Sequence, residues 1–260
     1  CIKMEIKFTI LGCGYSLGIP RIDGSFGNCN PKNKKNYRTR CSALLTVQNH
    51  NILIDTSPDI KSQLIRNKVR NIDKIFYTHP HADQTHGIND LRFFYIKNRI
   101  RIDVYADNFT KKHLLSSFGY CFKNKSEYPP ILKLNNLKET HRFKYKNKKI
   151  EFKSFKVQHG RINSIGYIIN KKCGYISDVS KIYNNDLKKI KNLKYLVIDC
   201  LRYEPHYSHF NLNDVLKLVE QIKPKKTILT NLNSEMDYSL LKRKLPKHIV
   251  PAYDGLSFIL

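Results

Sequence analysis

The chain has 260 residues, 41% of them hydrophobic, which suits one large folded domain and excludes general disorder. No apolar run approaches the roughly 18 residues of a membrane span, and residues 1–14 alternate like a strand without a cleavable hydrophobic stretch. Lysine and arginine number 47 against 21 acidic residues, a net charge of +26 that attracts phosphates and nucleic acid. The chain is also rich in Lys, Asn and Ile together, so the charge can reflect composition alone.

The cysteines argue against a disulfide framework. Their number is odd and no two are separated by two residues, which also disfavours a cysteine-rich zinc site. A reducing, cytoplasmic location fits this pattern best. The seven positions are 1, 13, 29, 41, 121, 173 and 200.

Hydrophobic periodicity predicts one continuous α/β pattern without repeats or linkers. The predicted strands cover 7–11, 43–47, 51–55, 74–78, 102–105, 149–157, 164–170, 174–177, 194–199 and 226–230. The predicted helices cover 59–67, 85–97, 108–118, 185–191, 213–222 and 238–244. This order favours two sheets with helices outside, in a single domain over 1–260. Pro129 and Pro130 lie in a stretch of weak periodicity, which predicts an insertion or substrate loop near 120–145.

A histidine-rich segment follows one of the predicted buried strands. Residues from Thr78 to Gly87 read THPHADQTHG. An extended chain projects alternate side chains to one side, so His79, His81 and Asp83 can converge. Imidazoles and a carboxylate are good ligands for zinc or manganese. The segment therefore predicts a metal site, against the alternative of a surface loop that happens to be rich in histidine.

Two further strand ends supply candidate ligands. His159 follows the predicted strand 149–157, and Asp178 follows the strand 174–177. Each residue alone is weak evidence for a metal ligand. A lone aspartate at a strand end, for example, is more often a helix cap. With His79 and His81 they complete a shell of three nitrogens and one oxygen.

The order and spacing of these residues resemble the metallo-β-lactamase superfamily, and more narrowly its phosphoribosyl 1,2-cyclic phosphate phosphodiesterase-like branch. The segments 11–21, 37–42, 54–59 and 86–92 support the narrower likeness, which covers nearly the whole chain. The resemblance implies an αβ/βα four-layer sandwich of two mixed β-sheets with helices on the outer faces. It also implies a first metal site made by His79, His81, His159 and Asp178, holding Zn²⁺ or Mn²⁺.

The chain departs from the family pattern at the second metal. Gln84 stands where the family has a histidine after Asp83, and Asn231 stands in place of the late histidine. Neutral amides are poor zinc ligands, so we expect about one metal per chain. His86 can partly compensate, or it is simply a histidine on a helix surface.

The resemblance also implies a histidine that protonates the leaving oxygen, and His209 is preferred to His206 for this role. Asp83, freed of a second metal, can orient or deprotonate the attacking water. Arg21, Arg38 and Arg40 lie in loops that the family places near the cleft, where they can contact phosphate or simply pair with carboxylates elsewhere.

These expectations describe a metal-dependent phosphodiesterase acting on a small cyclic or sugar phosphodiester. The alternatives are a tRNA-processing-type endoribonuclease, a thioester or lactam hydrolase, and a degenerate protein that binds metal or phosphate without turnover. The expected partner is a small phosphorylated substrate. Nucleic acid stays open because of the +26 charge, as does a homodimer, and no membrane is expected.

Overall fold

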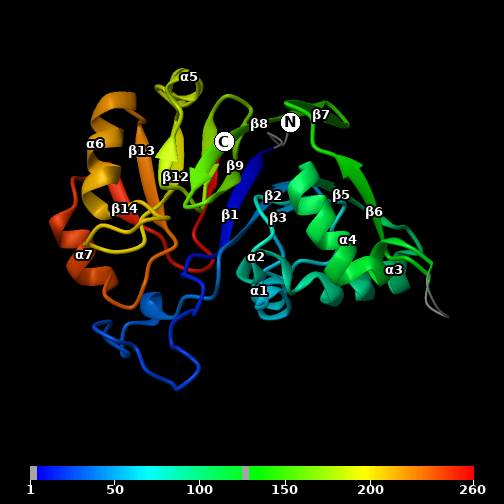
Figure 1. Cartoon of the computed structure of the whole chain (residues 1–260), viewed down its shortest axis with the longest axis horizontal. Helices are drawn as coiled ribbons and strands as arrows, with labels where there is room; N and C mark the ends of the chain where they lie inside the picture. Colours follow the sequence, from blue (N-terminus) through cyan, green and yellow to red (C-terminus); the bar gives the residue numbers. More distant parts are fainter. Residues whose placement is uncertain (1–4, 125–128) are drawn as a thin grey trace.

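The computed structural model describes residues 5–124 and 129–260, and two mixed sheets form its centre (Figure 1). The first sheet has the strand order β15-β1-β2-β3-β4-β5-β6. Its pairs are antiparallel from β15 to β3 and parallel from β3 to β6. Its strands are β15 (Ser257–Ile259), β1 (Ile6–Gly12), β2 (Ser42–Val47), β3 (His50–Ile54), β4 (Lys74–Phe76), β5 (Ile102–Ala106) and β6 (Leu132–Asn136).

The second sheet has the order β11-β8-β9-β10-β12-β13-β14, and β7 pairs with β8 beside this path. It is antiparallel from β11 to β10 and parallel from β10 to β14. Its strands are β7 (Thr140–Tyr145), β8 (Lys148–His159), β9 (Ile162–Ile169), β10 (Cys173–Ile176), β11 (Lys181–Ile182), β12 (Tyr195–Asp199), β13 (Lys226–Thr230) and β14 (Ile249–Pro251).

Helices cover the outer faces of both sheets, with α6 and α7 on one side of the molecule and α1, α3 and α4 on the other (Figure 1). The expected αβ/βα sandwich is therefore confirmed. The helices are α1 (Ile60–Arg66), α2 (Ala82–Thr85), α3 (Arg92–Asn98), α4 (Asn108–Phe122), α5 (Asn184–Leu187), α6 (Leu212–Ile222) and α7 (Tyr238–Lys244). Short 3₁₀ turns cover Lys34–Asn36, Ile88–Leu91 and Lys188–Ile190.

Helix α6 shows how the sequence specifies an outer helix. Asn211 caps it, and its side chain accepts a hydrogen bond from the backbone N–H of Asp214, whose carboxylate accepts one in return from the Asn211 N–H. Val215, Leu218 and Ile222 follow at helical spacing and are buried against the second sheet.

Aromatic side chains pack the two sheets together. Phe76 of β4 stacks on Phe152 of β8, with ring centroids 4.6 Å apart and planes 8° from parallel. Phe8 of β1 meets Tyr175 of β10 at 5.8 Å. All four side chains are essentially inaccessible to solvent. This packing fixes the ends of β4, β8 and β10 relative to one another.

Three predicted segments differ from the structure. The predicted helix 185–191 forms only the short α5 and the 3₁₀ turn that follows it. The predicted helix 85–97 is broken at Gly87, where an added Cβ would lie 2.0 Å from the carbonyl oxygen of Ser57. Gly87 lies between α2 and the 3₁₀ turn that leads into α3. The stretch near 120–145, predicted as an insertion or substrate loop, has regular structure in its described part, which forms the end of α4 and the strands β6 and β7, while residues 125–128 lie outside the described residues. Pairing with β5 and β8 supplies the order that the local sequence lacks.

Among the described helices, none combines the length and apolar character needed to span a bilayer.

The stacked core gives a stability prediction. Phe76→Ala removes a ring that is fully buried between the sheets and should lower the free energy of unfolding by about 3–5 kcal/mol. The matched control is Phe93→Ala, whose ring is 63% exposed, and it should change stability by about 0.5 kcal/mol or less. Urea denaturation of metal-free protein measures both. Equal losses would contradict the stacking of Phe76 between the two sheets.

Candidate metal centre

Three histidine rings converge where β4 and β8 end. The Nε2 of His79 lies 3.0 Å from the Nδ1 of His81, and the Nε2 of His159 lies 3.3 Å from that same Nδ1. His79 and His159 are buried, and His81 is exposed just before α2. The nitrogens that face one another come from sequence positions 78 residues apart, and the packing of the two sheets brings them together.

Hydrogen bonds behind the rings set which nitrogen faces inward. The hydroxyl of Thr78 donates to the carboxylate of Asp55 at 2.8 Å and therefore accepts from the Nδ1 of His79 at 3.0 Å. The Nδ1 of His159 donates to the carbonyl oxygen of Ser208 at 2.7 Å. In a neutral ring, each arrangement puts the proton on Nδ1 and aims the lone pair of Nε2 at the centre, as partners behind metal-binding histidines do.

The donor set fits a divalent cation. Two nitrogens at about 2.0–2.1 Å from one tetrahedral zinc lie about 3.3 Å apart, close to the separations between these rings. Burial lowers the pKa of His79 to about 3. Burial also lowers the pKa of His81, and the neighbouring His159 lowers it further. Neutral rings with facing lone pairs are a ready set of ligands for zinc or manganese.

Asp178 belongs to a second group that shares His159. Ligand atoms of His159, Asp178 and His209 lie within 4.8 Å of one another, as do those of the three-histidine group. Asp178 lies two residues beyond β10 and is 2% exposed. It therefore lies next to the histidines, and its role as a fourth ligand stays a prediction.

Amide groups occupy the region where the family pattern has second-site histidines. The side-chain N–H₂ of Gln84 donates to one oxygen of Asp178 at 3.4 Å and to Asp83 at 3.3 Å. The N–H₂ of Asn231 donates to the other oxygen of Asp178 at 3.4 Å and to Asp199 at 3.1 Å. Both carboxylate oxygens of Asp178 thus have amide donors, which partly offset negative charge without a second cation.

His209 is paired with a buried carboxylate. Its Nδ1 donates to Asp199 at 2.7 Å, and its ring centroid lies 4.6 Å from that of His159. Burial opposes a charge on His209, but the Asp199 carboxylate outweighs it and, with Asp178 and Asp83, raises the pKa to about 9. The pair therefore favours the protonated form of the His209 ring.

Asp83 is a weaker acid than usual. Burial, followed by the charge of nearby Asp178, raises its pKa to about 6. A carboxylate with this pKa can accept a proton near neutral pH.

Other predicted residues lie elsewhere. His86 is exposed and packs edge-on against Phe118 at 5.5 Å, outside both groups of candidate ligands. His206 bonds Ser208 within its own loop. Its ring centroid lies 5.3 Å from that of His209.

The arginines correct a further expectation. Arg38 is 1% exposed and donates to the backbone carbonyls of Asn233 and Met236, so it cannot meet a phosphate. Arg40 forms a two-pronged ion pair with Asp59. The charge of Asp83 also acts on Arg40, which places this guanidinium within electrostatic reach of the site. Arg21 donates to Ser25 within its own loop.

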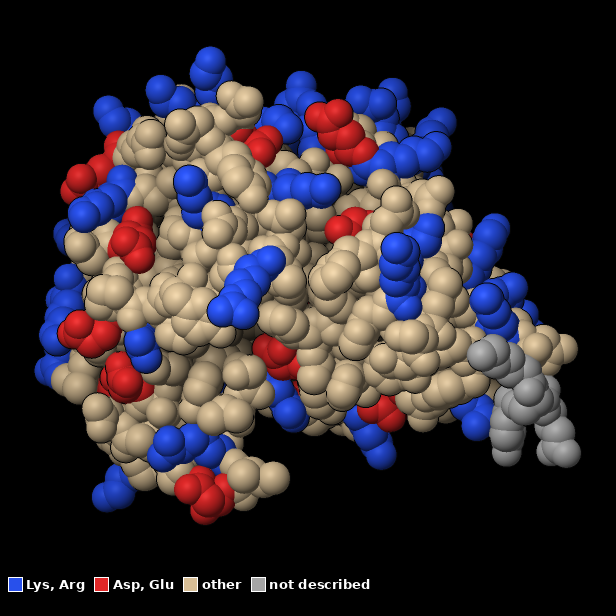
Figure 2. Space-filling view, in the orientation of Figure 1, with Lys and Arg blue, Asp and Glu red and all other residues tan. Residues whose placement is uncertain are grey.

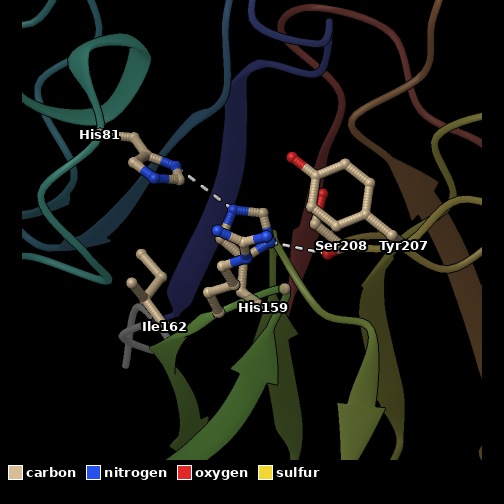
Figure 3. Close-up of a pocket in the computed structure, with 7 residues that line it drawn as sticks. His81, His159, Ile162, Tyr207 and Ser208 are labelled. Atoms are coloured by element: carbon tan, nitrogen blue, oxygen red, sulfur yellow. Dashed lines mark hydrogen bonds between the residues drawn. The ribbon is translucent and has the colours of Figure 1, made fainter.

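A cavity of about 440 Å³ opens beside the histidines (Figure 3). Of the residues that line this cavity, the sequence analysis had singled out only the predicted ligands His81 and His159. The sequence analysis also missed Asp55 and Asp199. Both lie at strand ends, as Asp178 does, so the argument that side chains at strand ends converge applies to them too. The lining residues are His81, His159, Gly160, Arg161, Ile162, Tyr207 and Ser208.

The fold and the histidine cluster are those of the metallo-β-lactamase hydrolases, and comparison with known proteins agrees. The family model described as "Beta-lactamase superfamily domain" matches residues 50–230, and the chain belongs to this family. The protein is therefore a hydrolase of the metallo-β-lactamase fold, a fold that typically binds divalent metals.

Several known proteins resemble the chain over nearly its whole length. A solved diphosphatase of the PhnP family is 28% identical, with a TM-score of 0.89 over 99% of this chain and 98% of that one. Zinc-bound PqqB from Methylobacterium extorquens is 15% identical, with a TM-score of 0.78 over 98% and 100%. The short form of human tRNase Z is 15% identical, with a TM-score of 0.69 over 97% and 98%. The last two show the fold alone.

One curated relative carries a different kind of name. An octanoyltransferase of Porphyromonas gingivalis is 29% identical over 98% of this chain but only 52% of its own length. The chain thus spans about half of that protein, and the transferase name describes the longer one.

The three-ring cluster predicts how metal affinity depends on its members. His81→Ala should weaken binding of Zn²⁺ by at least about 10–100-fold, since even changes behind the ligands cost that much. The matched control is His86→Ala, which removes an exposed histidine from the same segment and should leave affinity unchanged. Competition with a chromogenic chelator measures both. Full affinity in His81→Ala would show that this ring is no ligand.

The amide donors predict metal stoichiometry. Wild-type protein should bind about one Zn²⁺ per chain, because Gln84 and Asn231 occupy the second site. The double variant Gln84→His with Asn231→His should gain a second binding event in calorimetric titration, because two imidazoles then join Asp83 and Asp178. A control change at the exposed Asn49, to histidine, should add none. Two Zn²⁺ binding events of equal affinity in the wild-type protein would contradict this prediction.

Proposed function

We propose that the protein hydrolyses a small phosphorylated substrate at phosphorus, as a phosphodiesterase or diphosphatase that uses one Zn²⁺ or Mn²⁺. The observation that carries the proposal is the His209–Asp199 hydrogen bond beside the three-histidine cluster. It puts a proton donor next to a centre suited to a cation. The likeness to a PhnP-family diphosphatase over both whole chains supports phosphorus as the site of attack. A cyclic or sugar phosphodiester is the substrate class expected from the sequence.

His79, His81 and His159 would hold the cation, with Asp178 beside them as the predicted fourth ligand. The cation would supply Lewis acidity, which lowers the pKa of water and offsets charge on phosphoryl oxygens. Asp83 lies beside Gln84 with a carboxylate suited to accept the proton of the attacking water. Arg161 lines the adjoining cavity and would offer a positive charge to the phosphate.

His209 completes the reaction as general acid. Because Asp199 holds its Nδ1, the proton leaves from Nε2 to the departing oxygen. Asp199 itself acts as a positioning residue, since it fixes the orientation of the ring and favours its protonated form. A positioned acid typically contributes about 10²–10⁴-fold to the rate.

Endoribonuclease activity is the second candidate, favoured by the net charge of +26. Figure 2 shows lysines and arginines spread around the visible face, with acidic residues among them, rather than gathered into one stripe. A dispersed charge suits general attraction of anions better than a defined nucleic-acid track. A gel shift with tRNA, competed by a small cyclic phosphate, distinguishes the two activities.

A direct assay of hydrolysis distinguishes an enzyme from a protein that only binds metal or phosphate. The zinc- or manganese-loaded protein should hydrolyse bis(p-nitrophenyl) phosphate, and His79→Ala should abolish this release of p-nitrophenolate. Equal rates in both proteins would rule out the metal centre as the active site.

The general acid predicts a dependence on the leaving group. His209→Ala should slow hydrolysis of an alkyl or cyclic sugar phosphodiester by about 10²–10⁴-fold but affect an aryl ester far less, because aryloxide leaves without a proton. His206→Ala should show the smaller difference between substrates. Metal content, measured alongside, should stay at the wild-type value. Equal losses on both substrates, or lost metal, would make His209 a ligand or structural residue instead.

A further inference from the structure

Tyr207 is the most conspicuous side chain of the cavity that the proposed chemistry leaves unused. It is 79% exposed, yet it lines the same cavity as His81 and His159 (Figure 3). A large aromatic ring left in water at the mouth of a site is available to bind an apolar or planar group. Its neighbour Ser208 accepts the hydrogen bond of His159, so the ring is one residue from the support of a predicted ligand.

The backbone of Gly160 lies close to one edge of the Tyr207 ring. Gly160, in the turn between β8 and β9, has φ +58°. A Cβ there would lie 2.9 Å from the Cβ of Ser208 and 3.2 Å from the Cε2 of Tyr207. The ring of His206 lies 4.9 Å from Tyr207 on its own loop, with planes 32° apart. Two segments therefore support the ring, while most of its surface stays open.

The rest of the wall complements a planar group that carries a phosphate. Ile162 lies across the paired histidines from Tyr207 and adds a partly buried apolar side chain (Figure 3). The exposed Arg161 contributes a positive charge beside it. The cavity of about 440 Å³ is of a size for a small ligand.

We propose that Tyr207 is a stacking platform for a nucleobase, so that the substrate is a phosphodiester or diphosphate with a nucleoside arm. The proposal rests on the proposed function, because it places the phosphate of that substrate at the metal centre. Stacking on an aromatic side chain tolerates any base and is worth about tenfold or more in affinity. Tyr207 thus selects substrates through the nucleoside group, which stays attached to phosphorus when the leaving group departs.

Two esters with the same leaving group test this selection. Thymidine 5′-(p-nitrophenyl phosphate) and methyl p-nitrophenyl phosphate both release p-nitrophenolate and differ only in the nucleoside. In the zinc-loaded wild-type protein, the KM of the thymidine ester should be about tenfold lower. Tyr207→Ala should bring the ratio of the two KM values near one, whereas Tyr207→Phe should keep it because the ring remains. A ratio unchanged in Tyr207→Ala would overturn the proposal.

The control removes another exposed tyrosine. Tyr120→Ala changes a side chain that is 47% exposed on α4 and does not line this cavity, so it should keep the wild-type ratio. A ratio lost in Tyr207→Phe as well as in Tyr207→Ala would assign the effect to the hydroxyl and contradict stacking.

Binding without turnover separates this proposal from the proposed function. Calorimetry on the zinc-loaded protein should find thymidine 5′-monophosphate about tenfold tighter than methyl phosphate, and Tyr207→Ala should remove that difference. If neither ester is hydrolysed but this preference persists, the hydrolase assignment fails and the platform stands. Equal binding in wild-type protein overturns the platform. A ten-nucleotide single-stranded RNA should bind no tighter than the mononucleotide, and much tighter binding would overturn a free nucleotide as the ligand.

Discussion

The site depends on one constraint: the Nδ1 of His81 faces the Nε2 of His79 at 3.0 Å and the Nε2 of His159 at 3.3 Å, and only a proton or a cation can lie between such nitrogens. His79 and His159 meet this constraint through hydrogen bonds on their far nitrogens, to Thr78 and to the Ser208 carbonyl. Burial of His79 disfavours the charged ring. Lone pairs held this way repel one another unless a proton or a cation lies between them, so we propose that the stacked sheets that set these strand ends create a binding site for metal.

A second constraint is the buried negative charge beside the rings. Asp178 and Asp199 are both almost inaccessible, and uncompensated carboxylates at such depth are costly. Amide hydrogens from Gln84 and Asn231 and the ring of His209 face these carboxylates. The amides that stand in place of second-site histidines thus supply donors to these carboxylates, and His209 is paired with Asp199. We propose that one cation and one proton donor take the place of two cations.

Features set by local geometry could be predicted from the sequence. Alternation along an extended chain placed His79 beside His81, but it fails for Asp83, which lies in α2 and joins neither ligand group. The helix pattern of α6 came from its cap and apolar spacing. Features that depend on packing between distant segments could not be predicted. Arg38 reads as a loop arginine in the sequence, but its guanidinium is buried on backbone carbonyls. Strands β6 and β7 carry weak local signals and are ordered by partners distant in sequence. Asp199 could have been predicted as a site residue, because it is the last residue of β12 and Asp178 lies just beyond the end of β10.

The central claim is a single cation held by the three-histidine cluster, with amides in the second position. Crystals of the zinc-loaded protein, measured at the zinc absorption edge, test it most directly through an anomalous difference map. The account predicts one strong peak within bonding distance of His79, His81 and His159, with Gln84 and Asn231 still donating to Asp178. A second peak of similar height between Asp83 and Asp178, or no peak among the three histidines, would contradict it.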